Sequence, residues 1–129
     1  MESMKKKALI IEDDVDLAKL LAVRFMNRGF EVIIASDGIE GIERATEMSP
    51  DIVTLDLMLP GMPGEEVCRC LRREKKTENL PIIMLTAKNS DVDRIVGKVI
   101  GADNYISKPF DIETLFNRVD ELLAGTGQP

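Results

Sequence analysis

Five short runs of apolar residues recur along the chain, separated by longer stretches in which apolar and polar residues alternate at helical spacing. Runs that are apolar throughout are typical of strands buried on both faces of a parallel sheet, with helices packed on each side. Because crossovers between parallel strands are right-handed, this pattern predicts a three-layer α/β sandwich with five strands and five helices. The predicted strands are Lys7–Ile11, Val32–Ile34, Ile52–Asp56, Ile82–Thr86 and Asn104–Ser107.

The stretches between the strands carry apolar residues at the i, i+3, i+4 and i+7 positions of amphipathic helices. Gly29 is expected to end the first helix, and Ser36-Asp37-Gly38 to lead the chain into the second. The third helix is predicted over Gly64–Arg73, and the charged run RREKKTEN at its far end is expected to be solvated. The apolar positions of the five helices are Ala18, Leu21, Ala22 and Phe25; Ile39, Ile42 and Ala45; Val67 and Leu71; Val92, Ile95, Val96, Val99 and Ile100; and Ile112, Leu115, Phe116, Val119, Leu122 and Leu123.

Polar side chains stand where four of the five strands end. Glu12, Asp13 and Asp14 follow the first strand, and Asp56 ends the third. The fourth strand ends in Thr86, and Lys108 follows the fifth. Because the carboxyl ends of parallel strands lie at one edge of a sheet, these side chains are expected to form a single site. Asp14 can equally cap the helix that follows it.

The acidic residues of this site favour a divalent cation. Glu12, Asp13 and Asp56 bring three negative charges together, and two carboxylates about 4 Å apart repel by roughly 4 kcal/mol at an effective dielectric of about 20. A site with oxygen ligands from few protein groups suits Mg²⁺, which keeps several waters, and Mn²⁺ should substitute for it.

A cation, a carboxylate, a hydroxyl and an ammonium group together suit a phosphoryl group. Asp56 can attack phosphorus and form an acyl phosphate. The cation and Lys108 would neutralise the charge that develops on the phosphoryl oxygens, and Thr86 could donate a hydrogen bond to one of them. The sequence therefore predicts phosphoryl transfer to Asp56.

Four motifs, LIIEDD, IVTLDLMLPGMPG, IIMLTA and YISKPF, stand in the order and at the spacing of a known family. The chain resembles the receiver domain of bacterial two-component response regulators, of the CheY-like superfamily, from about Lys7 to Leu123. The resemblance implies a flavodoxin-like fold with strand order 2-1-3-4-5. It also implies that Asp56 is the phosphoacceptor, that Asp13 and Asp56 bind Mg²⁺ directly, that Glu12 acts largely through water, and that the backbone carbonyl of Met58 is a further ligand.

The resemblance also implies how the phosphoryl group is held and sensed. Thr86 and Lys108 would hold it, and Tyr105 would be the aromatic residue whose ring position tracks Thr86. The surface made by the fourth helix, fifth strand and fifth helix would then change, and an output domain or downstream protein would bind it. The peptide bond before Pro109 is expected to be cis.

Two features depart from the family pattern. Pro63 stands where many relatives have Asp, which should stiffen the loop after the third strand. Receivers that dimerise through the surface just described carry a set of charges there, of which only part is present. We therefore expect a monomer or a weak, phosphorylation-dependent dimer. Arg94, Asp103 and Arg118 match that set, whereas Val99, Asn104, Thr114 and Asp120 do not.

The composition of the chain limits the kinds of partner that it is expected to bind. The 129 residues suit one domain, and a net charge of −6 disfavours direct binding to nucleic acid. The chain has no histidine, so the phosphoryl donor is expected to be a separate histidine kinase or histidine phosphotransfer protein. Cys68 and Cys70 point apart on a helix and make neither a disulfide nor a zinc site. The apolar run after Lys5–Lys7 is too short for a signal peptide or membrane span, which predicts a cytoplasmic protein.

Two other functions can be weighed against this prediction. An aspartyl-phosphate hydrolase of the haloacid dehalogenase type would need an acid two residues after the nucleophile, where this chain has Met58. A receiver-like binding module would signal without phosphate, which leaves the complete set of acids, hydroxyl and lysine unexplained. We expect a signalling domain that catalyses only its own phosphorylation and dephosphorylation. Its expected limits are residues 7–124, with a disordered extension at 1–6 and a flexible tail at 125–129.

Overall fold

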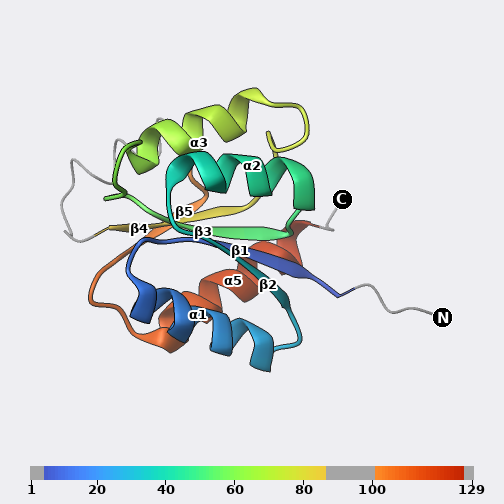
Figure 1. The fold of residues 1–129 in the computed structure, drawn as a ribbon. Helices are drawn as coiled ribbons and strands as arrows, with labels where there is room; N and C mark the ends of the chain where they lie inside the picture. Colours follow the sequence, from blue (N-terminus) through green and yellow to red (C-terminus); the bar gives the residue numbers. More distant parts are fainter. Residues whose placement is uncertain (1–4, 87–100, 127–129) are drawn as a thin grey trace.

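The computed structural model describes residues 5–86 and 101–126, which form a five-stranded parallel sheet covered by helices. The strand order is β2-β1-β3-β4-β5, which confirms the predicted flavodoxin-like topology (Figure 1). The second strand is one residue longer at each end than predicted, and the other four have the predicted bounds. The strands are β1 (Lys7–Ile11), β2 (Glu31–Ala35), β3 (Ile52–Asp56), β4 (Ile82–Thr86) and β5 (Asn104–Ser107).

Two layers of helices enclose the sheet. Helices α1 (Val15–Asn27) and α5 (Ile112–Thr126) cover one face, and α2 (Gly38–Met48) and α3 (Gly64–Arg73) cover the other (Figure 1). The fourth predicted helix, with Val92, Ile95, Val96, Val99 and Ile100, lies outside the described residues. No helix in the described part of the chain is both long and apolar enough to cross a membrane.

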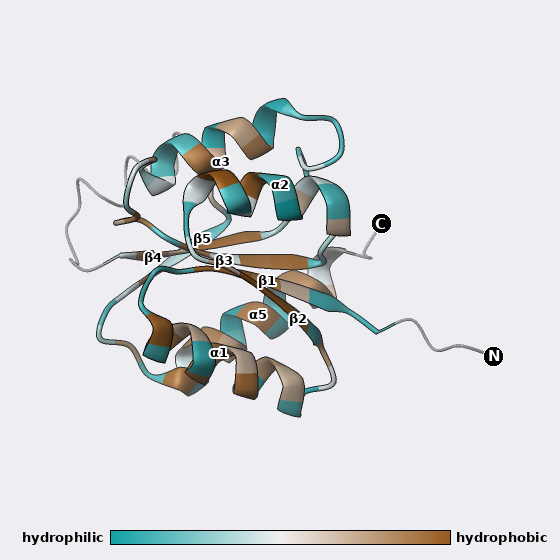
Figure 2. Cartoon of the chain, in the orientation of Figure 1, coloured by the Kyte–Doolittle hydropathy of each residue, from teal (hydrophilic) through white to brown (hydrophobic). Residues whose placement is uncertain are grey.

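The core is divided by the sheet into two clusters of buried residues, because successive residues of a strand point to opposite faces. Beside α1 and α5, Phe25 and Phe116 pack edge to face with ring centroids 4.8 Å apart. Beside α2 and α3, Val67 and Leu71 pack on strand residues such as Leu55, and both are buried as predicted. The strands therefore carry apolar residues almost throughout (Figure 2).

The ends of α1 and α2 follow the turn chemistry of the sequence. The Oδ1 atom of Asp14 accepts hydrogen bonds from the backbone N–H groups of Asp16 and Leu17, at 3.0 and 3.2 Å. Asp14 therefore caps α1, which is one of the two roles predicted for it. Asp37 caps α2 in the same way, since its Oδ1 atom accepts from the N–H of Glu40 at 2.8 Å.

The apolar spacing of α2 gave one wrong prediction. Ile39 is 61% exposed, whereas Gly38 and Gly41 are the buried positions of that turn. A Cβ atom on Gly41 would lie 2.5 Å from the Cδ1 atom of Ile11, so α2 lies too close to β1 for any side chain at that position. Gly41 faces the sheet and Gly38 faces Val67 of α3, and Ile39 consequently faces solvent.

The charged run after α3 is also less solvated than predicted. Thr77 is buried and donates from Oγ1 to the carbonyl of Leu71 at 2.5 Å. Arg72 is half-buried and is occupied by several carbonyl groups. Composition alone could not reveal this, because the partners of Arg72 include residues some 30 positions further along the chain.

Candidate functional site

Three carboxylates gather at the carboxyl ends of β1 and β3, which are neighbours in the sheet. One carboxylate oxygen from each of Glu12, Asp13 and Asp56 lies within 4.8 Å of the others. The side chains of Glu12 and Asp56 are only 1% and 5% exposed, whereas Asp13 is exposed. The sequence-based prediction that these acids meet at one edge of the sheet is therefore met by the geometry.

Within residues 5–86 and 101–126, one lysine, Lys108, partly balances this charge. The Nζ atom of Lys108 lies 3.3 Å from Oδ2 of Asp56 and 3.5 Å from Oε1 of Glu12. The backbone N–H of Lys108 donates to the carbonyl of Thr86 at 2.5 Å, so the lysine is held where β4 and β5 end together. The peptide bond between Lys108 and Pro109 is cis, as the resemblance implied.

Glu12 is the acid that responds most to this crowding. Burial raises the pKa of its carboxyl group, and a hydrogen bond shared with Asp56 and the negative charge of Asp56 raise it further, to about 7 from 4.5. The ammonium group of Lys108 and the N–H of Asp14 lower the pKa by less. Glu12 can therefore hold a proton near neutral pH, and a cation bound to the three acids would displace that proton.

The oxygen donors fit the Mg²⁺ ion that the resemblance implies. Carboxylates are ligands that Mg²⁺ prefers, and an exposed Asp13 leaves room for the waters that this ion retains. Two of the three acids are buried, and Lys108, the one lysine beside them among the described residues, brings a single positive charge to three carboxylates. Glu12, Asp13 and Asp56 would therefore hold a divalent cation that supplies the missing positive charge.

The loop after β3 is tied to Asp56. The Oδ1 atom of Asp56 accepts a hydrogen bond from the N–H of Met58 at 3.0 Å, which leaves Oδ2 facing Lys108. A Cβ atom on Gly64 would lie 2.6 Å from the carbonyl oxygen of Asp56, so α3 begins directly against the end of β3. Pro63 is the N-cap residue of α3 and makes no side-chain cap there.

Thr86 lies on β4, which is beside β3, and Tyr105 lies on β5, the next strand in the sheet. Thr86 is the buried last residue of β4, and it pairs with Ser107 of β5 at the same edge as Asp56. Tyr105 is half-buried and packs with the residues between the sheet and α2 and α3. The structure thus brings Thr86 to the predicted edge and sets Tyr105 two residues before Ser107 on the neighbouring strand.

Asp103 and Arg118, which match the dimerisation set, and Asp120, which does not, each have a charged partner within the chain. Asp103 pairs with Arg72 at 3.0 Å, Arg118 with Glu121 at 3.3 Å, and Asp120 with Arg28 at 2.9 Å. Arg94 and Val99 lie outside the described residues. The contact of Asp103 with Arg72 was missed by sequence reasoning, because no local pattern joins the end of one helix to the start of a strand.

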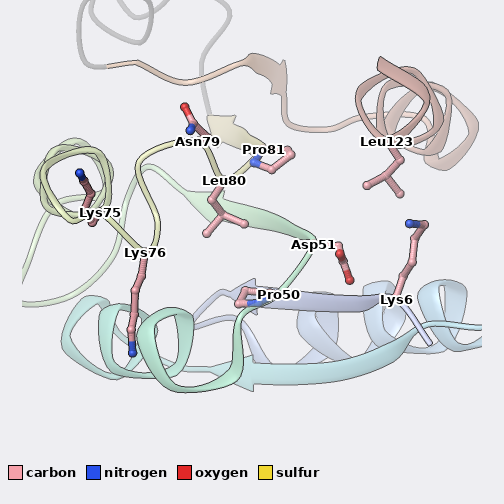
Figure 3. A pocket seen from close by; sticks show the side chains of 9 residues that line it. All are labelled: Lys6, Pro50, Asp51, Lys75, Lys76, Asn79, Leu80, Pro81 and Leu123. Carbon is pink, nitrogen blue, oxygen red and sulfur yellow. The ribbon is translucent and has the colours of Figure 1, made fainter. Parts of the chain in front are cut away.

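A separate hollow of about 300 Å³ opens at the opposite, amino-terminal edge of the sheet. Pro50, Leu80 and Leu123 line it, with lysine residues at its margin (Figure 3). The amino groups of Lys75 and Lys76 point in opposite directions there, and neither points at that of Lys6 (Figure 3). The lysines therefore do not converge on a common anion, and the hollow gives no ligand assignment.

Comparison with known proteins points to one family. Residues 8–120 match the family described as the response regulator receiver domain. The chain is similar to the DNA-binding response regulator MtrA of Mycobacterium bovis, with 43% identity over 119 residues, which are 92% of this chain and 51% of that protein. It is also similar to the DNA-binding dual master transcriptional regulator RpaA of Synechocystis sp., with 42% identity over 120 residues, 93% of this chain and 50% of that protein. The chain spans about half the length of the curated relatives it matches.

Solved structures of response regulators share the fold of this chain. The chemotaxis protein CheY4 of Vibrio cholerae superposes on this chain with a TM-score of 0.88 at 29% sequence identity. The superposition covers 93% of this chain and 100% of the CheY4 chain.

Proposed function

The chain belongs to the response regulator receiver domain family of two-component signal transduction, and from this premise we propose that Asp56 accepts a phosphoryl group in a Mg²⁺-dependent reaction. The proposal is supported by the charged groups that surround Asp56. Its Oδ2 atom is 3.3 Å from the ammonium group of Lys108, and two further carboxylates lie within 4.8 Å. A buried nucleophile with a fixed positive charge beside it suits in-line attack on phosphorus.

In the proposed reaction, a bond forms between a carboxylate oxygen of Asp56 and phosphorus while the bond from phosphorus to the donor nitrogen breaks. The electron pair of the broken bond stays on the donor imidazole. Lys108 stabilises the charge of the transferring group, and Thr86 donates a hydrogen bond to one of its oxygens. Glu12, Asp13, Asp56 and the carbonyl of Met58 are the proposed cation ligands, and Mg²⁺ or Mn²⁺ would neutralise the phosphoryl oxygens when bound.

The proposed donor is a phosphohistidine on a separate histidine kinase or histidine phosphotransfer protein, since the chain has no histidine of its own. We propose that residues 7–124 form the receiver and catalyse only their own phosphorylation and dephosphorylation. The relatives named as DNA-binding regulators are about twice as long as this chain. The net charge of −6 on the 129 residues disfavours binding to DNA, and any DNA binding is therefore assigned to residues beyond the receiver.

The proposed signal passes from Thr86 to Tyr105. A phosphoryl group on Asp56 attracts the hydroxyl of Thr86, and the space this opens lets the Tyr105 ring turn inward. The surface of the fourth helix, β5 and α5 then changes its binding preference for an output domain or a downstream protein. Couplings of this kind are typically about 1–3 kcal/mol.

Phosphorylation of an Asp56→Asn variant tests this proposal. With acetyl phosphate and Mg²⁺, the wild-type chain should take up one phosphoryl group by mass, and Asp56→Asn should take up none. Asp37→Asn is the matched control, since it also neutralises an aspartate but asparagine can still cap α2. Chelation of Mg²⁺ should stop labelling, and Mn²⁺ should restore it.

The same experiment separates the two rival functions. Undiminished labelling of Asp56→Asn would contradict the assignment of the phosphoacceptor. Turnover of added phosphomonoesters would favour a hydrolase, and an absence of labelling in the wild-type chain, with acetyl phosphate and with a kinase, would favour a module that signals without phosphate.

A further inference from the structure

An arginine at the end of α3 ties together three segments at the amino-terminal edge of the sheet. The Nε atom of Arg72 donates to the carbonyl of Gly101 at 2.9 Å, and Nη2 donates to Oδ2 of Asp103 at 3.0 Å. The Nη1 atom donates to the carbonyl of Leu80, just before β4, at 2.7 Å. Nη1 also donates to the carbonyls of Glu78 and Thr77, at 3.1 and 3.4 Å.

Gly101 permits this close approach of the two segments. Its φ angle of +99° lies in the left-handed region, and a Cβ atom there would lie 3.2 Å from both Cγ and Nε of Arg72. The guanidinium group is thus packed against the backbone that leads into β5. Arg72 therefore holds the start of β5 and the start of β4 at the same time.

Asp103, the main acidic partner of Arg72, holds Ile82 by two hydrogen bonds. The backbone N–H of Asp103 donates to the carbonyl of Ile82 at 2.9 Å, and the Oδ2 atom of Asp103 accepts from the N–H of Ile82 at 2.8 Å. Any shift of β5 along β4 breaks both hydrogen bonds and the contact with Arg72. Asp103 thus specifies one register between these strands.

The fifth strand has few other features that would specify its register. It has four residues, it lies at the edge of the sheet, and Ile106 is the one residue of the four that is buried. Register is weakly specified where a strand is short and its faces are only partly buried. The contacts of Asp103 and Arg72 therefore matter more for β5 than they would for a central strand.

The register of β5 decides where the catalytic lysine lies. The strand pairs Tyr105 with Met84 and Ser107 with Thr86, and Lys108 comes next. We propose that Asp103 and Arg72 are positioning residues, which fix the register of β5 at one edge of the sheet and thereby place Lys108 beside Asp56 at the other. This inference rests on the proposed function of Asp56 and Lys108.

A second ion pair provides a matched control. Arg28 and Asp120 join α1 to α5 at 2.9 Å, close to the 3.0 Å of Arg72 and Asp103, and this ion pair includes no residue of β4 or β5. The side chains of Arg28 and Asp120 are 41% and 59% exposed, against 20% and 38% for Arg72 and Asp103. Asp120→Ala therefore removes a comparable carboxylate without touching the register of β5.

The rate of labelling and the affinity for Mg²⁺ should respond differently. In Asp103→Ala, the rate constant for labelling by acetyl phosphate should fall about tenfold, a part of the hundredfold or more expected when a stabilising group is removed outright. The Mg²⁺ dissociation constant should not rise, because Asp13 and Asp56 are held by β1 and β3, and a displaced Lys108 can lower it by at most about threefold to tenfold, the change expected for loss of its charge. Asp120→Ala should change neither quantity.

Two further variants test the structural explanation. Asp103→Asn keeps a side-chain oxygen that can accept from the N–H of Ile82, so it should recover most of the labelling rate. Arg72→Met should resemble Asp103→Ala, and it replaces that variant if Asp103→Ala does not fold. Folding is checked by circular dichroism and by the urea midpoint. Wild-type labelling rates in both Asp103→Ala and Arg72→Met would overturn the proposal, as would an equal loss of rate and of Mg²⁺ affinity.

A spectroscopic measurement tests the register without phosphorylation. Tyr105 is the single tyrosine of the chain, so incorporated 3-fluorotyrosine gives one ¹⁹F resonance that reports on β5. Asp103→Ala should shift or split this resonance, and Asp120→Ala should not. An unchanged resonance in Asp103→Ala would overturn the inference even if the wild-type chain is never labelled. Failure of wild-type labelling alone would instead contradict the proposed function.

Discussion

Glu12 shows how one buried acid can couple folding to pH. Its pKa is raised to about 7 in the folded chain, mainly by burial, from 4.5. The folded state therefore holds the proton more tightly than the unfolded state does. The stability contributed by the protonated acid is fully present below pH 4.5 and is lost as the pH rises through about 7.

This gives a prediction for the chain without divalent cations. Between pH 5 and pH 8, the free energy of unfolding of the wild type should fall relative to that of Glu12→Gln, by on the order of 2 kcal/mol. Urea unfolding in the presence of a chelator measures both. The raised pKa of Glu12 would be contradicted if the difference in unfolding free energy between the two proteins stayed constant with pH. It would also be contradicted if the wild type became more stable than Glu12→Gln as the pH rises.

Replacing threonine by valine should have opposite effects on stability at two buried positions. Thr54 lies in the middle of β3, and its Oγ1 atom has no hydrogen-bond partner among the described residues. Thr54→Val should therefore stabilise the chain by about 1 kcal/mol, since a buried hydroxyl without a partner is costly. Thr77 is equally buried but donates to Leu71, so Thr77→Val should destabilise it by about 1 kcal/mol. Denaturant midpoints of the two variants, compared with the wild type, provide the measurement.

Among the secondary-structure elements, α2 is the one placed by its glycines. Gly41→Ala should destabilise the chain by about 1–3 kcal/mol through the contact with Ile11, even though alanine favours helices by about 1 kcal/mol over glycine. A Cβ atom on Gly125 in α5 would meet no other atom within 4 Å, so Gly125→Ala should be neutral or stabilising. Thermal unfolding of the two variants measures this difference. If Gly125→Ala were destabilised as well, contact with the sheet would not explain the loss of stability in Gly41→Ala.

The same helix shows where a periodic pattern stops being informative. The apolar spacing of Ile39, Ile42 and Ala45 has a helical period, but it carries no information about how closely the helix approaches the sheet. Gly41 decides that distance, and Ile39 consequently lies in solvent. In α3 the predicted apolar positions Val67 and Leu71 are themselves buried, so there the pattern identified the buried face.

The candidate site was predictable because topology alone brings strand ends together. Once five parallel strands are recognised, Glu12, Asp56, Thr86 and Lys108 must lie at one edge of the sheet. The distances, the raised pKa of Glu12 and the role of Asp103 could not be predicted, because they depend on side-chain packing across the fold. The unpredicted contacts of Arg72 join residues 29 and 31 positions apart.

Across the folded chain, Lys108 and a bound cation compete for the same carboxylates. The lysine contributes one positive charge, 3.3 Å from Asp56 and 3.5 Å from Glu12, to a molecule of net charge −6. Lys108→Met should therefore bind Mg²⁺ more tightly, by about threefold to tenfold after allowing for the partial exposure of the lysine. The same variant should label more slowly with acetyl phosphate, because the group that stabilises the transferring phosphoryl is gone.

The two effects of Lys108→Met have opposite signs, which makes the prediction hard to satisfy by loss of structure. A damaged site would bind Mg²⁺ more weakly and label more slowly together. Calorimetric titration with Mg²⁺ and the labelling rate measured at saturating Mg²⁺ separate these cases. Arg118→Met is the control, since it removes a positive charge that pairs only with Glu121 among the described acids, and both quantities should stay at the wild-type level. Weaker Mg²⁺ binding in Lys108→Met would contradict the prediction. It would mean that Lys108 favours Mg²⁺ binding, by holding the three carboxylates in place, more than its positive charge disfavours it.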